Sequence, residues 1–354
     1  MGSYLLKRIF LLIPTLFGAL LLNFLLLKAL PGSPLDYLMG DLYGGASADG
    51  GVSTFNGGIK EVYGEGLPED YQKTQASSSF EKGSLWKQFT SMAWRYLLLD
   101  FGQSYFQDKT VVQLIQERMP VSLSLGLFSL IIIYGLAIGL GIQKARREES
   151  FFDRWTSFVL TFFYAMPNFL LALLLIIFFA GGFYWSWFPL QGLYSENWAM
   201  LSWPQKILDY THHMVLPLIT IVLGGMGSFT FFIKSAFLEE LKKPYVQAVY
   251  ARGGSQKCAI YRHALKHVML NIVSHFPHMF MRIFLMNTLV IEMIFSLDGM
   301  GFLMLQSILK RDYPVILGIF FVFTLLSLFV QIVVDISYFF LDPRVHFRHE
   351  KFYE

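Results

Sequence analysis

Apolar residues gather in six long stretches, and the segments between them carry nearly all of the charged residues. Each stretch is about 20 residues or longer, which is the length that a helix needs to cross the hydrocarbon core of a bilayer. The pattern therefore predicts an all-α membrane protein with six transmembrane helices. We place these helices at residues 9–30, 121–142, 155–182, 214–232, 271–290 and 315–341.

The first stretch follows Lys7 and Arg8, as the apolar part of a signal peptide would. It is longer than the roughly 7–15 apolar residues of such a signal, and Pro31-Gly32-Ser33-Pro34 follows it in place of a small-residue cleavage site. We expect it to be retained. Residues 1–30 then form a short cytoplasmic stub and the first helix.

Lysine and arginine in the connecting segments set the expected orientation, because cytoplasmic loops are enriched in both. Sixteen of them lie in the 70 positions of segments 1–8, 143–154, 233–269 and 342–354. The other connections hold 10 in 144 positions. Both termini are therefore predicted to be cytoplasmic. This orientation makes residues 31–120 a long extracytoplasmic loop, residues 121–341 a five-helix core and residues 342–354 a cytoplasmic tail.

The long outer loop has two parts. Residues 40–67 contain nine glycines, and a segment of this composition buries little surface. Further on, apolar residues recur at the spacing of one helix face: Leu85, Trp86, Phe89, Ala93, Tyr96 and Leu97. The sequence leaves three roles open for this predicted helix: packing on the bundle, lying on the membrane surface, or docking a partner protein.

The cytoplasmic segment 233–269 is polar, yet it has two patterned parts. Val246, Val249 and Tyr250 recur at helical spacing before Gly253-Gly254, and Ile260, Ala264 and Val268 do so after it. Glycine permits the left-handed backbone that a sharp bend requires. We predict two short amphipathic helices joined at this turn. A bent element of this kind fits a groove on a cytoplasmic partner, although an ordinary surface loop is the alternative.

The composition agrees with a membrane protein. Hydrophobic residues make up 55% of the 354 positions and charged residues 15%, where soluble domains average about 25% charged. The mean hydropathy is +0.49. These values exclude a soluble enzyme, a disordered chain and a secreted disulfide scaffold. One cysteine, Cys258, allows no internal disulfide, and the net charge of +3 gives no reason to expect a nucleic-acid partner.

Residues 245–253 resemble the EAA loop of ABC importer permeases, in which a Glu-Ala-Ala triplet precedes a glycine at a fixed spacing. Gln247, Ala248 and Val249 occupy the triplet here, and Gly253 matches the glycine. Gln247 keeps hydrogen bonding but lacks the charge of the usual glutamate. Residues 261–267, Tyr-Arg-His-Ala-Leu-Lys-His, resemble a Trp-Arg-His-Ala-Leu-Arg-Asn run of the dipeptide and oligopeptide subfamily, with His267 in place of the asparagine.

Further motifs of this subfamily occur in its order. They are Leu99-Asp100-Phe101-Gly102-Gln103-Ser104, residues 115–120, the E-x-x-F-S-x-x-G-x-G element from Glu292 to Gly301, Arg311-Asp312-Tyr313-Pro314, and the run from Asp335 to Arg344. The resemblance covers residues 1–34 and 95–345. Within the subfamily the sequence looks most like the first permease subunit of microcin C-type peptide importers, on residues 1–8, the glycine-rich loop, residues 179–182 and residues 203–210.

The resemblance implies the type I ABC importer permease fold, in a subunit of the bacterial cytoplasmic (inner) membrane that takes up oligopeptides by alternating access. The chain has no G-x-x-x-x-G-K-[ST] motif, so ATP and Mg²⁺ are expected on separate ATPase subunits and the chain itself is not expected to be an enzyme. The other implied partners are a second homologous permease and an extracytoplasmic peptide-binding protein. The implied ATPase-coupling residues are Tyr245, Gln247, Ala248, Gly253, Arg262 and His263.

The fifth predicted helix carries His275, His278 and Arg282 on one face, at positions i, i+3 and i+7. Ionisable groups inside a membrane are costly and usually functional. We hypothesise that this face lines the translocation path. The alternative is that the three side chains pair with groups on a neighbouring helix. A metal site is not expected, because no carboxylate accompanies the histidines.

Two other classes of membrane protein compete with this interpretation. A channel or secondary transporter for small solutes would work without ATP, and a secondary transporter usually places a carboxylate at mid-membrane. Glu292 and Asp335 lie near the ends of predicted helices instead. An intramembrane hydrolase would need a nucleophile or zinc motif such as G-x-S-x-G or H-E-x-x-H, and the sequence contains neither.

Overall fold

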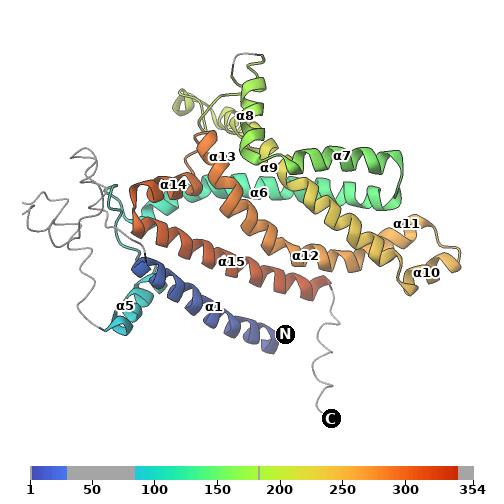
Figure 1. Ribbon diagram of the computed structural model, residues 1–354, viewed down its shortest axis with the longest axis horizontal. Coiled ribbons are helices and arrows are strands. Elements are labelled where there is room, and N and C mark those ends of the chain that lie inside the picture. The colour runs from blue at the N-terminus through green and yellow to red at the C-terminus, as the bar shows by residue number, and fades with distance from the viewer. Residues whose placement is uncertain (1, 30–83, 182–183, 342–354) are drawn as a thin grey trace, which may run out of the picture. The chain divides into compact units, whose positions relative to one another are not determined.

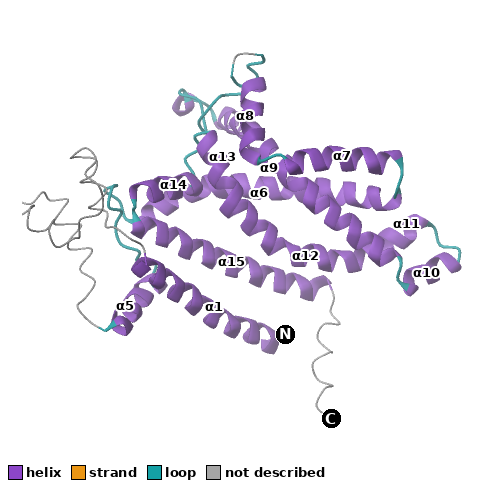
Figure 2. Ribbon diagram, viewed as in Figure 1, coloured by secondary structure: helices purple, strands orange, loops and turns teal. Residues whose placement is uncertain are grey.

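The computed structural model describes residues 2–29, 84–181 and 184–341. The glycine-rich stretch 40–67 and the predicted tail 342–354 lie outside the described residues. The described part is built of helices and their connections (Figure 2), and it contains one isolated β-bridge, between Gln103 and Thr110.

The helices of the described residues follow one another in chain order (Figure 1). They are α1 (Gly2–Ala29), α5 (Leu85–Leu97), α6 (Val111–Arg146), α7 (Phe151–Ala165), α8 (Asn168–Phe179), a 3₁₀ turn (Trp198–Met200), α9 (Trp203–Leu241), α10 (Pro244–Ala251), α11 (Gln256–Cys258), a π-helical turn (Ala259–Ala264), α12 (Leu265–Met281), a second π-helical turn (Arg282–Asn287), α13 (Thr288–Ile294), α14 (Met300–Lys310) and α15 (Tyr313–Leu341).

Five of the described helical runs are long and apolar enough to cross a bilayer, and the bent pair α7–α8 makes a sixth if it counts as one span. All six predicted stretches fall on these helices. Helix α9 runs well beyond its predicted span on both sides, and α11 to α13 form one helical run over Gln256–Ile294. A helix needs no change of backbone at the membrane boundary, so hydropathy locates a span but not the ends of its helix.

The third predicted span is broken into two helices. Helix α7 ends at Ala165 and α8 begins at Asn168, with an angle of 99° between them. The cause lies at Pro167, because a proline disfavours helical geometry in the residue before it. Met166 accordingly has an extended backbone, with ψ of 129°.

The chain forms two compact units. The second unit comprises residues 10–29, 84–117 and 303–325 of the described chain. In it, the ring of Phe89 of α5 contacts Phe17 and Phe24 of α1 at 5.5 and 5.6 Å between centroids. Tyr96 of α5 contacts Phe101 and Phe321 at 5.1 and 5.5 Å. Among the roles left open for α5, packing is therefore the one that the structure shows.

The buried residues of α5 coincide only in part with its predicted apolar face. Phe89, Met92 and Tyr96 are buried, whereas Leu85, Trp86 and Leu97 are exposed. Apolar residues on a membrane protein face lipid and core alike, so hydropathy alone does not separate the two faces.

Two family-like motifs meet in the second unit. Ser104 Oγ donates a hydrogen bond to the carboxylate of Asp312, and the backbone N–H of Tyr105 donates to the same group at 3.3 Å. The carboxylate also accepts a hydrogen bond from the N–H of Val315 in the first turn of α15, so Asp312 acts as the N-cap of that helix. Burial raises the pKa of Asp312 above its ordinary value, and these hydrogen bonds oppose the shift.

The first unit comprises mainly residues 118–302 and 326–341 of the described chain. In it, the motif from Glu292 to Gly301 is held by hydrogen bonds between its two ends. The buried carboxylate of Glu292 accepts a hydrogen bond from Ser122 Oγ at 2.6 Å. It also accepts hydrogen bonds from the N–H groups of Gly301 and Phe302 at 2.8 and 3.0 Å. This carboxylate thus caps the start of α14. A Cβ on Gly301 would lie 2.5 Å from Cα of Leu289, so this close approach requires glycine.

Candidate functional site

The predicted bent element is present at the end of α9, and Figure 1 shows α10 and α11 there. Helix α10 ends in a Schellman motif: the N–H of Gly253 donates to Tyr250 O, and the N–H of Gly254 donates to Val249 O, each at 2.9 Å. Gly253 has φ of +78°, a left-handed conformation that other residues adopt at a cost. A Cβ on Gly254 would lie 2.5 Å from Val249 Cγ1. Both glycines are therefore needed for the turn.

The second half of the element differs from the prediction. The residues after the turn form no separate short helix, because α11 continues through a π-helical turn into α12 and onward to Ile294. The turn is therefore continuous with a helical run that is long and apolar enough to cross a membrane.

Helix α10 is fixed to the end of α9 by polar contacts. Tyr245 Oη donates to Glu240 Oε1 at 2.5 Å, and Lys243 Nζ pairs with Glu240 Oε2 at 2.6 Å. Gln247 Nε2 donates to the carbonyl of Leu241 at 2.8 Å. Partial burial of the Tyr245 hydroxyl and its hydrogen bond to Glu240 raise the pKa of Tyr245 above its ordinary value, so the phenol stays a donor. The polar atoms of Tyr245 and Gln247 therefore position α10.

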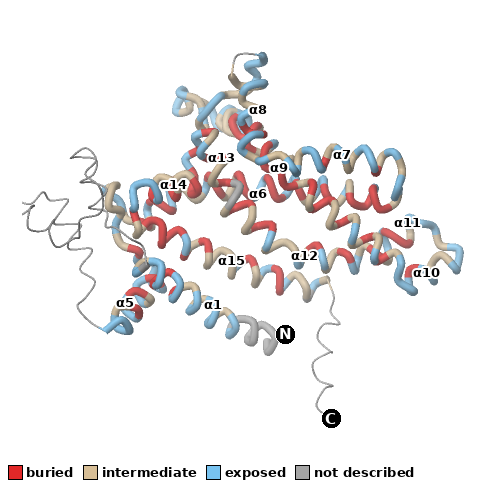
Figure 3. The backbone as a smooth tube through the Cα atoms, viewed as in Figure 1, coloured by how far each residue is buried: buried red, intermediate tan, exposed pale blue. Residues whose placement is uncertain are grey.

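The apolar residues of the element form its inner side. Val246, Ile260, Ala264 and Val268 are buried, as their helical spacing predicts, and Ala259 joins them, whereas Val249 and Tyr250 are half-buried. The outer side is exposed (Figure 3). Of the predicted coupling residues, Tyr245, Gln247, Ala248, Gly253 and Arg262 are exposed and His263 is half-buried. Arg252 and Lys257 are exposed as well, so the exposed residues of the element include several basic ones.

The structure brings His275, His278 and Arg282 together along one side of α12. The rings of His275 and His278 lie 5.5 Å apart, and the His275 ring stacks on Phe232 of α9 at 4.7 Å. Arg282 Nη1 lies 3.4 Å from Ser228 Oγ, also on α9. Neither a group of three metal-binding side chains nor an ion pair of Arg282 is found within residues 2–29, 84–181 and 184–341.

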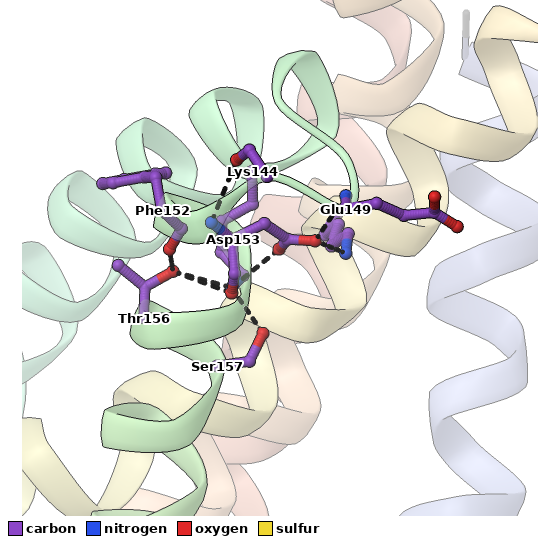
Figure 4. Close-up of polar contacts among 8 residues, drawn as sticks. Lys144, Glu149, Phe152, Asp153, Thr156 and Ser157 are labelled. Carbon is purple, nitrogen blue, oxygen red and sulfur yellow. Dashed lines mark hydrogen bonds and ion pairs between the residues drawn. The ribbon is translucent and has the colours of Figure 1, made fainter.

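A buried ionic cluster joins α6, α7 and α9 (Figure 4). Lys144, with no exposed side-chain surface, has Nζ 3.0 Å from Asp153 Oδ1 and donates to Thr156 Oγ1 and Ser157 Oγ at 2.9 and 2.7 Å. Lys234 Nζ of α9 lies 2.6 Å from Asp153 Oδ2. The cluster fixes the α6–α7 hairpin to the helix that leads to α10.

Neither Glu240 nor this cluster was foreseen from the sequence. Glu240 stands between Glu239 and the basic pair Lys242-Lys243, where a solvated charged segment is expected. The sequence places Lys144 and Asp153 at the two ends of a short connection between predicted spans. Charged residues at such positions are equally typical of a solvated, basic cytoplasmic loop, so they do not predict a buried cluster.

Comparisons with known proteins agree on a family. The family described as "binding-protein-dependent transport system inner membrane component" matches residues 135–347. The peptidoglycan transport system permease protein YejB of Agrobacterium fabrum is 41% identical over 360 residues, covering 98% of this chain and 99% of the relative. The inner membrane ABC transporter permease protein YejB of Escherichia coli O157:H7 is 40% identical over 362 residues, with the same coverage.

More distant relatives share the full length and the fold. The oligopeptide transport system permease protein AppB of Bacillus subtilis is 28% identical over 348 residues, covering 98% of this chain and 100% of the relative. An inward-facing structure of the MetNI methionine ABC transporter matches with a TM-score of 0.50 and 13% identity, covering 65% of this chain and 97% of that chain. At this identity the match shows the fold alone: the type I ABC importer permease fold.

Proposed function

The chain belongs to the family of binding-protein-dependent transport system inner membrane components, and we propose that it is the permease subunit of an ATP-driven importer of oligopeptides. The family, its relatives and its apolar helices make it a multi-pass protein of the bacterial inner membrane. The observation that carries the proposal is the bent element of α10, Gly253 and α11, which is anchored on one side and exposed on the other.

The peptide substrate is inferred from relatives. One relative is named as an oligopeptide transport permease and another as a peptidoglycan transport permease. We extend the proposal to microcin C-like peptides, on the sequence resemblance at residues 1–8 and 203–210. The support for this finer assignment is the resemblance alone, whereas peptides as a class are supported by the relatives as well.

Coupling to ATP is assigned to the bent element. Separate ATPase subunits would hold ATP and Mg²⁺ and contact the exposed side of α10. Because Tyr245, Lys243 and Gln247 bind α10 to the last turn of α9, a displacement of α10 moves α9 with it. Helix α9 packs against α7, α8 and α12, so the first unit would respond as packed helices moving between two states.

The other partners complete the transporter. A second, homologous permease would form the other wall of the path, and an extracytoplasmic binding protein would deliver the peptide, as the family description indicates. His275, His278 and Arg282 are proposed to face that path.

Disrupting the glycine turn should release the ATPase. In Gly253→Pro, the ring removes the N–H that caps α10 and excludes the φ of +78°. Affinity purification of the tagged chain in mild detergent, with partners identified by mass spectrometry, should recover the second permease but at least tenfold less ATPase. Ala248→Glu, on the exposed side of α10 where folding is unaffected, should give the same loss.

The matched control for this experiment is Gly192→Pro. Gly192 also has a positive φ, of +86°, and its N–H also donates a hydrogen bond, to Phe295 O at 3.0 Å. It lies in the connection between α8 and α9, far along the chain from the turn. If Gly253→Pro and Ala248→Glu both co-purified with as much ATPase subunit as the wild type does, the coupling role of the bent element would be contradicted.

A further inference from the structure

We propose that His275, His278 and Arg282, together with Ser228, form a subsite that binds a carboxylate of the transported peptide. The inference rests on the proposed function and adds the chemistry of one substrate contact. The subsite lies wholly within the first unit, between α9 and the helical run Gln256–Ile294.

Arg282 supplies the positive charge of the subsite. It lies inside a membrane-spanning run, where an unpaired guanidinium is costly. Its contact with Ser228 Oγ is long, at 3.4 Å, and uses one of five N–H donors. Among the residues that the structure describes, no carboxylate forms an ion pair with it. A guanidinium with donors to spare is suited to a carboxylate, which can accept two parallel hydrogen bonds.

The two histidines extend the same surface. The His275 ring stacks on Phe232 at 4.7 Å and on Phe229 at 5.7 Å, so two aromatic rings of α9 fix its plane. The His278 side chain is exposed, and those of His275 and Arg282 are half-exposed. The face is therefore supported by α9 on one side and open on the other, as a contact for a passing substrate must be.

The backbone at this point is irregular as well. A π-helical turn begins at Arg282 and runs to Asn287. Such turns are rare and often occur at functional sites, because the extra residue rotates the side chains around them. Here it separates the regular helix that carries the histidines from α13.

The Arg282 guanidinium would also suit an acidic residue of the second permease. In that case Arg282 would hold the two permeases together and would not distinguish between substrates. The two roles differ in one observable, which is whether the effect of an Arg282 variant depends on the charge of the peptide.

The test measures uptake of three peptides by the reconstituted full complex: trialanine, trialanine amide and Ala-Asp-Ala amide. Arg282→Gln should lower uptake of trialanine about tenfold relative to wild type, while trialanine amide changes less than twofold. Arg282→Lys should restore most of the trialanine uptake. A loss that extends to Ala-Asp-Ala amide identifies any carboxylate as the ligand, and a loss confined to trialanine identifies the terminal one.

The control is Arg154→Gln, which removes the same charge from an exposed position on α7 and should leave all three uptakes unchanged. Equal losses for the three peptides in Arg282→Gln, or no loss for any, would overturn the subsite. If the wild-type complex takes up none of the three, the proposed function fails, and the subsite fails with it.

Discussion

Replacing Glu292 with alanine is expected to lower the free energy of unfolding by about 4 kcal/mol or more. The carboxylate accepts hydrogen bonds from Ser122 Oγ and from the N–H groups of Gly301 and Phe302. The side chain is fully buried, so water does not replace it. Each buried donor left without an acceptor costs about 1–3 kcal/mol. The start of α14 loses its cap at the same time.

This effect is measured by heating samples of the purified chain to a series of temperatures. Size-exclusion chromatography then gives the folded fraction that remains at each temperature. Glu292→Ala should unfold roughly 5–10 °C below wild type. Glu292→Gln keeps one acceptor oxygen, so its unfolding temperature should fall by less than half as much as that of Glu292→Ala. Glu196→Ala, at an exposed position, is the control and should not shift. A midpoint for Glu292→Ala equal to that of wild type would mean that the cap does not stabilise the fold.

Replacing Asp153 with leucine should cost about 3–5 kcal/mol, because it leaves one fully buried lysine and one largely buried lysine without a counter-charge. Lys144 has no exposed side-chain surface, whereas Lys234 retains 20% exposure and can turn toward solvent. The buried, unpaired Lys144 is therefore expected to account for most of the loss.

A double variant tests this explanation. Lys144→Met alone should lower the free energy of unfolding less than Asp153→Leu does, since Asp153 keeps Lys234 as its partner. Lys144→Met combined with Asp153→Leu should be more stable than Asp153→Leu alone, because the fully buried charge is then removed and the remaining Lys234 can turn toward solvent. The same heating assay compares the three proteins. A double variant whose loss equals the sum of the two single losses would show that the ionic contact does not govern stability here.

Much of the fold follows from the sequence, because a bilayer demands about 20 apolar residues per crossing. Five of the six stretches coincide with single helical runs, and the third coincides with the bent pair α7–α8. The 99° bend at Pro167 could not be predicted, since a proline signals an interruption but the angle depends on what each half packs against. Helix α8 packs against α9 and α13, and no local pattern contains that information. Only Phe89 and Tyr96 of the predicted apolar face of α5 are buried, and the pattern could not single them out because lipid-facing and core residues are equally apolar.

The candidate site was predictable where it depends on local chemistry. A left-handed glycine between two amphipathic patterns defines the turn at Gly253 without any knowledge of tertiary structure. The anchoring of Tyr245 by Glu240, and the cluster of Lys144, Asp153 and Lys234, depend on burial of charged side chains. A single sequence gives no signal for that, because charged residues beside a membrane span are usually solvated. The contact of Ser104 with Asp312 joins residues 208 positions apart, which is beyond any local pattern.

The measurement that tests the central proposal most directly is peptide uptake into proteoliposomes containing this chain, the second permease and the ATPase, with the binding protein outside. The ATPase sites face the lumen, which is loaded with ATP and Mg²⁺. Radiolabelled peptide should accumulate with ATP, fail to accumulate with a non-hydrolysable analogue, and fail to accumulate when the Gly253→Pro chain is used. Accumulation driven by an imposed ion gradient in the absence of ATP and ATPase subunits would contradict the account and indicate a secondary transporter.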